Sequence, residues 1–250
     1  MKKRRTKLTL LCVLLSAVCL LSIVMAWKEY AHWERDRHAF EDLASMVTLP
    51  DGTTVPTVES TEVPERPALD TDSTEAKETT AGTEPEPVTQ KRNLAPIMEQ
   101  NGDCVGWLYI EGTAVDYPVM HTPNQPQKYL RKNFHGEYSV SGVPFLDHRC
   151  SLDSTDLIIY GHNMRNGTMF ADLKKYLDDD FLEGHRTIEL ETAEGLRYFT
   201  VTEVVKTDIY DERYDRLDMA DGVQHLILST CYGSSKSGRL LVIAVETAPN

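Results

Sequence analysis

The stretch LILSTCYGSSKSGRLLVIAV, residues Leu226–Val245, is the part of the sequence from which the fold is best inferred. It holds two apolar runs of strand-forming residues joined by a polar loop rich in glycine and serine, a pattern typical of a β-hairpin. The hairpin places Cys231, at the end of the first run, close to Arg239, at the start of the second. A thiol beside a guanidinium is a candidate nucleophile beside a group that stabilises negative charge. Taken alone, however, the pair is explained better as a buried cysteine and a strand-edge arginine.

A second stretch, Asp156–Leu177, changes that balance because it also places a reactive side chain at the end of a strand. Leu157–Tyr160 predicts a buried strand, Gly161 breaks it, and His162 follows directly. Apolar residues then recur at helical spacing between residues 170 and 177, which predicts an amphipathic helix. If the two strands lie parallel in one sheet, His162 and Cys231 meet at the same edge.

These two stretches, together with a third, resemble the sortases, and within them class B, cysteine transpeptidases of Gram-positive bacteria. Ile227–Cys231 is similar to the TLSTC signature, with Ile where the family has Thr, and Arg239 matches the arginine of the next strand. The block YGHNM…G.MF.DL is matched by Tyr160–Leu173, and GWLYIEGTAVDYPVM, Gly106–Met120, resembles the family's opening strands. The likeness runs in order from about Asn93 to Val245.

The resemblance implies a role for each of these residues. Cys231 is expected to be the nucleophile, His162 the general acid and base, and Arg239 the group that stabilises the oxyanion and the transition state. Ser229 and Thr230, which precede Cys231 on its strand, are predicted to contact the substrate. The resemblance implies no cofactor. Because no Cys/His spacing suggests zinc and no carboxylates cluster as in a calcium site, the sequence also predicts no metal.

The remaining pattern predicts an all-β fold with minor helices. Eight short strands with one clear helix are typical of a barrel, and the resemblance implies the eight-stranded sortase-type β-barrel. The barrel is expected to follow an N-terminal transmembrane helix and a disordered linker. The predicted strands are Gly106–Ile110, Val115–Val119, Val143–Asp147, Leu157–Tyr160, Thr187–Glu191, Leu196–Lys206, Leu226–Thr230 and Leu240–Val245.

The N-terminal residues, 1–27, predict a cytoplasmic basic tail and a transmembrane signal anchor. Met1–Lys7 is strongly basic, and Leu8–Ala26 holds 19 residues without a charge. As a helix this run is about 28 Å long, enough to cross a bilayer core of about 30 Å. The basic cluster predicts a single-pass protein with its N-terminus inside the cell membrane and its catalytic domain outside. A cleaved signal peptide is the competing interpretation, but no good small-residue cleavage site follows the run.

Residues 28–47 predict a juxtamembrane amphipathic helix. Its apolar face holds Trp33, Phe40, Leu43 and Val47, and charged residues occupy the other positions. Such a helix is expected to dock on the membrane or on the catalytic domain, although a plain stalk helix has the same pattern.

Residues 48–92 are rich in Thr, Glu and Pro, and predict a disordered linker because they bury too little apolar surface to offset the entropy of ordering. The linker is interpreted as a tether that holds the domain within the wall, away from the membrane, or as a spacer with no preferred length. Residues 93–250 are the predicted catalytic domain. A chain beginning near Asn93 is therefore expected to be soluble and active.

Net charge disfavours two classes of binding partner, and the cysteines of the predicted domain favour free thiols. The 250 residues carry a formal net charge of -13, which disfavours binding to nucleic acid or to anionic surfaces. Cys104 and Cys150 lie in the predicted domain in addition to Cys231, and two unpaired thiols are favoured over a disulfide between them.

The resemblance implies a membrane-bound transpeptidase. It cleaves a surface protein's C-terminal sorting signal after Thr through a Cys231 thioester, then transfers the protein to an amine of a peptidoglycan precursor or cross-bridge. A pilin-polymerising sortase that uses a pilin lysine is the first alternative, and an inactive wall-facing binding module is the second. A plain cysteine protease, which transfers the same thioester to water, is weaker.

One segment departs from the class B pattern. Members carry a long excursion with a helix before the cysteine strand, whereas only the short, acidic Thr207–His225 is available here. The class suggests an NPxT or SPxT signal. The short segment predicts strong selection at Pro and Thr and looser selection at the first position.

Overall fold

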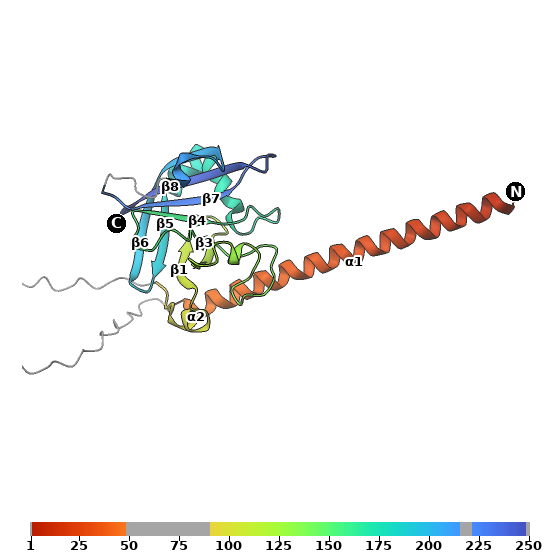
Figure 1. Cartoon of the computed structure of the whole chain (residues 1–250), viewed down its shortest axis with the longest axis horizontal. Helices are drawn as coiled ribbons and strands as arrows, with labels where there is room; N and C mark the ends of the chain where they lie inside the picture. The colour runs from red at the N-terminus through yellow and green to blue at the C-terminus, as the bar shows by residue number, and fades with distance from the viewer. Residues whose placement is uncertain (1, 49–90, 216–221, 249–250) are drawn as a thin grey trace, which may run out of the picture.

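The computed structural model describes residues 2–48, 91–215 and 222–248. Its centre is a closed barrel with strand order β1-β2-β3-β4-β7-β8-β6-β5 (Figure 1), which confirms the predicted fold class. The strands are β1 (Cys104–Tyr109), β2 (Asp116–Met120), β3 (Phe145–Leu146), β4 (Asp156–Tyr160), β5 (Thr187–Thr192), β6 (Gly195–Asp208), β7 (His225–Cys231) and β8 (Gly238–Thr247). The helices are α1 (Lys2–Val47), α2 (Ala95–Gln100) and α3 (Asp179–Gly184), with 3₁₀ helices η1 (Lys128–Leu130), η2 (Phe170–Leu177) and η3 (Glu212–Tyr214).

Alternation of side chains along β7 decides which residues face the barrel interior. Leu226 and Leu228 belong to the main core, whereas Ile227 belongs to a smaller apolar cluster on the other face of the sheet. Because side chains alternate with a period of two, Ser229 and Cys231 share the face of Ile227. The smaller cluster consists of Ile158, Ile227, Leu241 and Ile243, packed against Tyr160, Val205 and Tyr214. The reactive end of β7 therefore lies outside the barrel.

Helix α1 is one continuous helix that extends far beyond the barrel (Figure 1). Apolar side chains between residues 12 and 27 are exposed, as at Val13, Leu14 and Leu20. Among the described residues, α1 is the one helix long and apolar enough to cross a membrane, which agrees with a membrane anchor. The division of the helix at residue 27 stays a prediction, because α1 runs through that point without a break.

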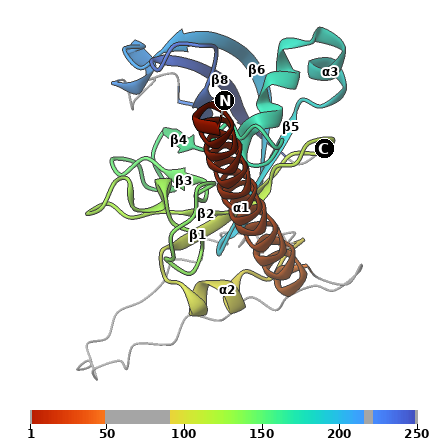
Figure 2. The same cartoon turned by 90° about the vertical axis from the view of Figure 1, so that its right-hand side faces the viewer.

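The C-terminal part of α1 packs on the barrel beside β2 and α2, as Figure 2 shows along the helix axis. Phe40, Leu43 and Val47 are buried in the main core, and the Phe40 ring meets Tyr117 edge to face at 5.1 Å. The sequence allows the apolar face of this helix to dock on the membrane or on the catalytic domain. In the structure this face contacts the barrel. The folded part of the chain therefore includes the end of α1, which precedes Asn93 in the sequence.

Residues 49–90 lie outside the described residues. Their disorder therefore stays a prediction. Their two neighbours are described: Thr48 pairs with Arg92 in an antiparallel bridge, and the Asn93 amide donates to the Val47 carbonyl at 2.7 Å. The segment therefore leaves and rejoins the folded part at one place. The interpretation of this segment as a tether or a spacer concerns the same residues and stays a prediction.

The helix expected after His162 is a 3₁₀ helix, η2, rather than an amphipathic α-helix. Its large buried side chains, Phe170, Leu173 and Tyr176, recur every third residue, whereas the predicted Leu177 is only partly buried. A spacing of three places all of them on one face of a 3₁₀ helix, which has 3.0 residues per turn. The barrel contact thus selects the tighter helix.

Candidate active site

The hairpin of β7 and β8 pairs Cys231 directly with Arg239. Cys231 is the last residue of β7 and is exposed, while Arg239 is the second residue of β8. The loop between them contains Gly233 in the left-handed region (φ 77), where a residue without a side chain is favoured. The predicted juxtaposition of thiol and guanidinium is therefore present in the structure.

His162 reaches the same edge because β4 and β7 are parallel, with Tyr160 opposite Ser229. Two hydrogen bonds continue the pairing past the strand ends: the Gly161 amide donates to the Ser229 carbonyl at 3.1 Å, and Thr230 Oγ1 donates to the Gly161 carbonyl at 2.8 Å. One residue further on, Asn163 Nδ2 donates to the Cys231 carbonyl at 2.9 Å. The parallel arrangement on which the sequence argument depended is thus confirmed.

Cys231, His162 and Arg239 line one groove of about 440 Å³. Its floor includes Tyr160 and Ser229, on β4 and β7. One wall comes from the β2–β3 segment, defined here as residues 121–144, and the other from described residues of the β6–β7 segment, defined as residues 209–224. The wall residues are Pro126, Gln127, Tyr129, Leu130 and Val143 on the first side, and Ile209 and Tyr214 on the second.

The His162 ring is held by a main-chain carbonyl from the β2–β3 segment. Nε2 lies 2.9 Å from the Leu130 carbonyl oxygen, and since a carbonyl only accepts, Nε2 carries the proton. This fixes the tautomer and leaves Nδ1 as the atom that gains or loses a proton. Burial lowers the pKa of His162, the charge of Arg131 lowers it further, and the bond to Leu130 opposes both.

Arg239 is anchored by its own loop. Nη1 donates to the carbonyls of Lys236 at 3.1 Å and Gly238 at 2.9 Å. Within the described part of the chain, no carboxylate forms an ion pair with Arg239. Arg239 is therefore paired with Cys231 without an ion-pair partner among the described residues, and its other donors can serve an oxyanion.

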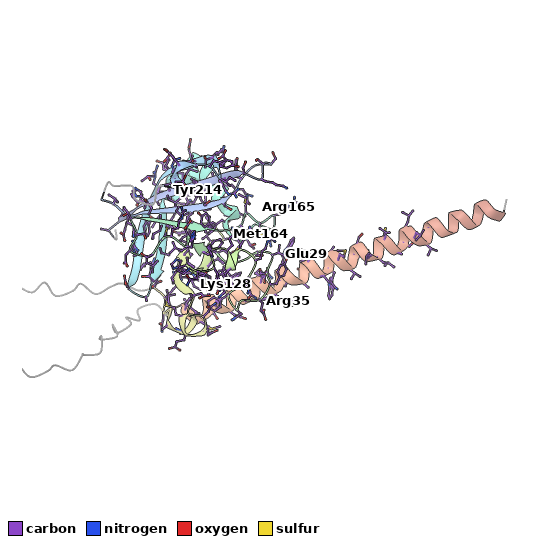
Figure 3. All side chains as sticks on the ribbon, viewed as in Figure 1. Glu29, Arg35, Lys128, Met164, Arg165 and Tyr214 are labelled. Carbon is purple, nitrogen blue, oxygen red and sulfur yellow. The ribbon has the colours of Figure 1, made fainter. Side chains whose placement is uncertain are left out.

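Ser229 and Thr230 are buried, and both hydroxyls already have partners. Ser229 Oγ lies 2.7 Å from the Tyr214 hydroxyl, and the Tyr214 ring (labelled in Figure 3) stacks on Tyr160 at a centroid distance of 6.2 Å. Thr230 bonds to Gly161 and so ties β7 to β4. Substrate contact by these two residues stays a prediction, and Thr230 has a clear structural task beside it.

Two contributions to the groove were not predicted from the sequence. The Leu130 carbonyl is a main-chain atom, so no residue type marks it. Ile209 and Tyr214 come from the short acidic segment, which supplies more of the wall than its length suggested. The available signal was a pair of tyrosines, Tyr210 and Tyr214, within an acidic stretch. Residues 216–221 of that segment lie outside the described residues.

The other cysteines of the domain differ sharply from Cys231. Cys104 and Cys150 are free and buried, and burial raises the pKa of the Cys104 thiol to about 12 and that of Cys150 in the same direction. Buried thiols with raised pKa are poor nucleophiles. Of the barrel cysteines, Cys231 alone combines exposure with a neighbouring histidine and arginine.

Comparison with known proteins agrees with this geometry. Residues 108–247, more than half of the chain, match the family model of the sortase domain. The chain belongs to the sortase family. Sortase B of Listeria monocytogenes is 37% identical over 164 residues, 62% of this chain and 66% of the relative. Sortase B of Staphylococcus aureus is 35% identical over 120 residues, 47% of this chain and 48% of the relative. The alignments thus span less than two thirds of these curated relatives.

The solved structure of a Staphylococcus aureus sortase B–substrate complex superposes with a TM-score of 0.57 at 27% identity. It covers 63% of this chain and 85% of that chain. The relatives by sequence and by structure are both sortase B, so this sortase is of class B.

Proposed function

We propose that this sortase is a membrane-anchored cysteine transpeptidase. It cleaves a C-terminal sorting signal after Thr through a thioester on Cys231, and transfers the protein to an amine of the cell wall or its precursor. The observation that carries the proposal is the parallel pairing of β4 with β7, which brings His162 to Cys231 in the groove beside Arg239.

In the first half of the reaction, the Cys231 thiolate attacks the carbonyl carbon of the signal's Thr. Negative charge develops on the carbonyl oxygen, and Arg239, anchored by Lys236 and Gly238, donates hydrogen bonds to it. His162 donates its Nδ1 proton to the leaving amide nitrogen. The peptide bond breaks, and Thr is left as a thioester on sulfur. The amine then attacks the thioester, His162 takes a proton from it, and the thiolate leaves.

The reactive ion pair requires a protonated His162. Because burial lowers the pKa of His162, its imidazolium form is less populated near neutrality than that of an exposed histidine. The fraction of molecules that hold the thiolate–imidazolium pair is limited accordingly. This fraction rises when the pKa of His162 rises, which makes the ring's surroundings part of the catalytic rate.

The helix α1 supports membrane anchorage with the N-terminus inside and the barrel outside. Limited proteolysis of intact protoplasts tests this topology. Cleavage of the barrel by external protease is the expected result, and protection of the barrel would reverse the orientation.

Substrate preference follows from the groove. A peptide library of NPxT, SPxT and LPxT variants, scored by release of the C-terminal fragment, is expected to show strong selection at Pro and Thr. Pro sets the extended backbone and Thr must fit between Ser229 and Arg239. We expect tolerance at the first position, which is next to the short β6–β7 segment. Cleavage of LPxT peptides alone would contradict a class B preference, and absence of any cleavage by the full chain would contradict the proposal itself.

A further inference from the structure

Helix α1 carries a buried acid on the face that docks on the barrel. Asp36 is only 7% exposed, and its Oδ2 accepts a hydrogen bond from Ser139 Oγ at 2.6 Å. Burial of a carboxylate is unfavourable, and docking already has its apolar contacts in Phe40, Leu43 and Val47. The charge at Asp36 therefore calls for a reason beyond helix packing.

Ser139 is the partner that links α1 to a wall of the groove. It is fully buried in the β2–β3 segment, and its Oγ accepts from the amides of Ser141 at 3.1 Å and Gly142 at 3.2 Å. Its own amide donates to the Arg131 carbonyl at 3.0 Å. With its proton given to Asp36, the hydroxyl can accept both amides, so the carboxylate orients the whole turn.

The turn packs directly on the peptide that holds the catalytic histidine. Gly142 has φ 62, and a Cβ there would lie 2.5 Å from the Tyr129 carbonyl oxygen and 2.8 Å from that of Leu130. The Val143 amide donates to the Tyr129 carbonyl at 3.1 Å. The Gly142 turn thus packs against the Leu130 peptide, whose carbonyl accepts the Nε2 proton of His162.

We propose that Asp36 is a positioning residue for the transpeptidase reaction. Through Ser139 and the turn at Gly142, it sets the Leu130 carbonyl, and thereby the tautomer and orientation of His162. The proposal rests on the function proposed above for its effect on rate, but not for its effect on the His162 ring. The membrane helix is accordingly a supporting part of the active site as well as an anchor.

Kinetics of the full-length chain in detergent micelles test the rate effect. Asp36→Ala and Ser139→Ala are each expected to lower kcat about tenfold with KM changed less than about twofold, since the proton donor is misplaced and the peptide groove is not. The double variant should be no slower than either single one, because both break the same connection. Asp36→Asn keeps an acceptor oxygen and should fall between wild type and Asp36→Ala.

Asp42→Ala is the matched control, because it removes an exposed carboxylate from the same helix. It should leave kcat unchanged. Equal losses in Asp36→Ala and Asp42→Ala, or wild-type kcat in Asp36→Ala, would overturn the proposal. If Asp36→Ala fails to fold, Ser139→Ala carries the same test without altering α1.

A second measurement does not depend on activity. The side-chain nitrogen NMR spectrum of isotopically labelled histidine, assigned with His162→Gln, is expected to show the Nε2–H tautomer of His162 in wild type and in Asp42→Ala. A mixture of tautomers is expected in Asp36→Ala and Ser139→Ala. An unchanged tautomer in both would overturn the positioning role even if the enzyme cleaves peptides. A changed tautomer in a chain that cleaves nothing would uphold it and reject the proposed function.

Discussion

The cysteine side of the groove and the histidine side are built from very different lengths of chain. Cys231 and Arg239 face each other across one hairpin, and Arg239 is anchored by carbonyls within its own loop. His162 depends on the Leu130 carbonyl, in a segment that is tied to α1 through Ser139. The proposed nucleophile and the proposed oxyanion-stabilising arginine thus depend on local structure. The proposed proton carrier, His162, depends on contacts over more than one hundred residues of sequence.

Loss of the thiol is the largest effect expected on the cysteine side. Cys231→Ala should abolish cleavage of sorting-signal peptides and leave the fold intact, because it removes one exposed sulfur at a strand end. Peptide cleavage and a circular dichroism melt are the measurements. Residual turnover above the rate of the uncatalysed peptide would remove Cys231 from the mechanism.

Conservative replacement of the guanidinium comes next. Arg239→Lys keeps the charge but not the planar fork of donors that an oxyanion requires, so kcat/KM should fall on the order of 100-fold or more. His162→Ala should be comparably slow, since the proton donor is lost. Steady-state assays of both variants would check the assignment, which near-normal turnover in either would refute for that residue.

Two deletions separate the effect of the α1–barrel contacts from that of the chain that follows α1. One removes α1, and the other removes residues 49–90. A chain beginning near Asn93 is now expected to lose stability and at least about tenfold in kcat, because it lacks the buried Phe40, Leu43 and Val47 and the Asp36 bond. This reverses the expectation from the sequence alone.

In contrast, a short turn joining Thr48 to Lys91 in place of residues 49–90 should leave the melting temperature unchanged and kcat within about twofold of wild type. The two ends already pair in an antiparallel bridge, so closing them demands little rearrangement. Full activity of the chain from Asn93, or inactivity of the shortened chain, would break the comparison.

Removal of one charge near His162 tests how the surroundings of the ring set its pKa. Arg131→Gln removes a positive charge that lowers the pKa of His162, beyond the larger effect of burial. The pKa should rise, the acid limb of the kcat/KM profile should move to higher pH, and its plateau should increase about twofold, a modest change because Arg131 is exposed. A shifted limb without a higher plateau would indicate that neutral His162, as a base, starts the reaction.

Sequence patterns predicted the parts of the molecule that depend on local order. The strands around Cys231 and His162 have periodic apolar residues and clear turn residues, so their ends fall within one or two positions of β4, β7 and β8. The parallel register needed only the assumption of a shared sheet. The helix after His162 was predicted as an α-helix because a few apolar residues fit both periods, and barrel packing selected 3₁₀ geometry.

The histidine's support could not be predicted in the same way. The Leu130 carbonyl carries no signal in residue type, and Asp36 resembles any other acid on a charged helix until the helix is docked. The groove wall at Tyr214 depends on its stacking with Tyr160 and its bond to Ser229, neither of which a sequence spacing reveals.

The most direct test of the account is the covalent intermediate itself. The full-length enzyme is mixed with a sorting-signal peptide in the absence of an acceptor amine, quenched with acid, digested and analysed by mass spectrometry. The account predicts a mass increase equal to the peptide fragment that ends at Thr, carried by Cys231 and released by hydroxylamine. An adduct on Cys104 or Cys150, or steady cleavage with no adduct on any cysteine, would contradict it.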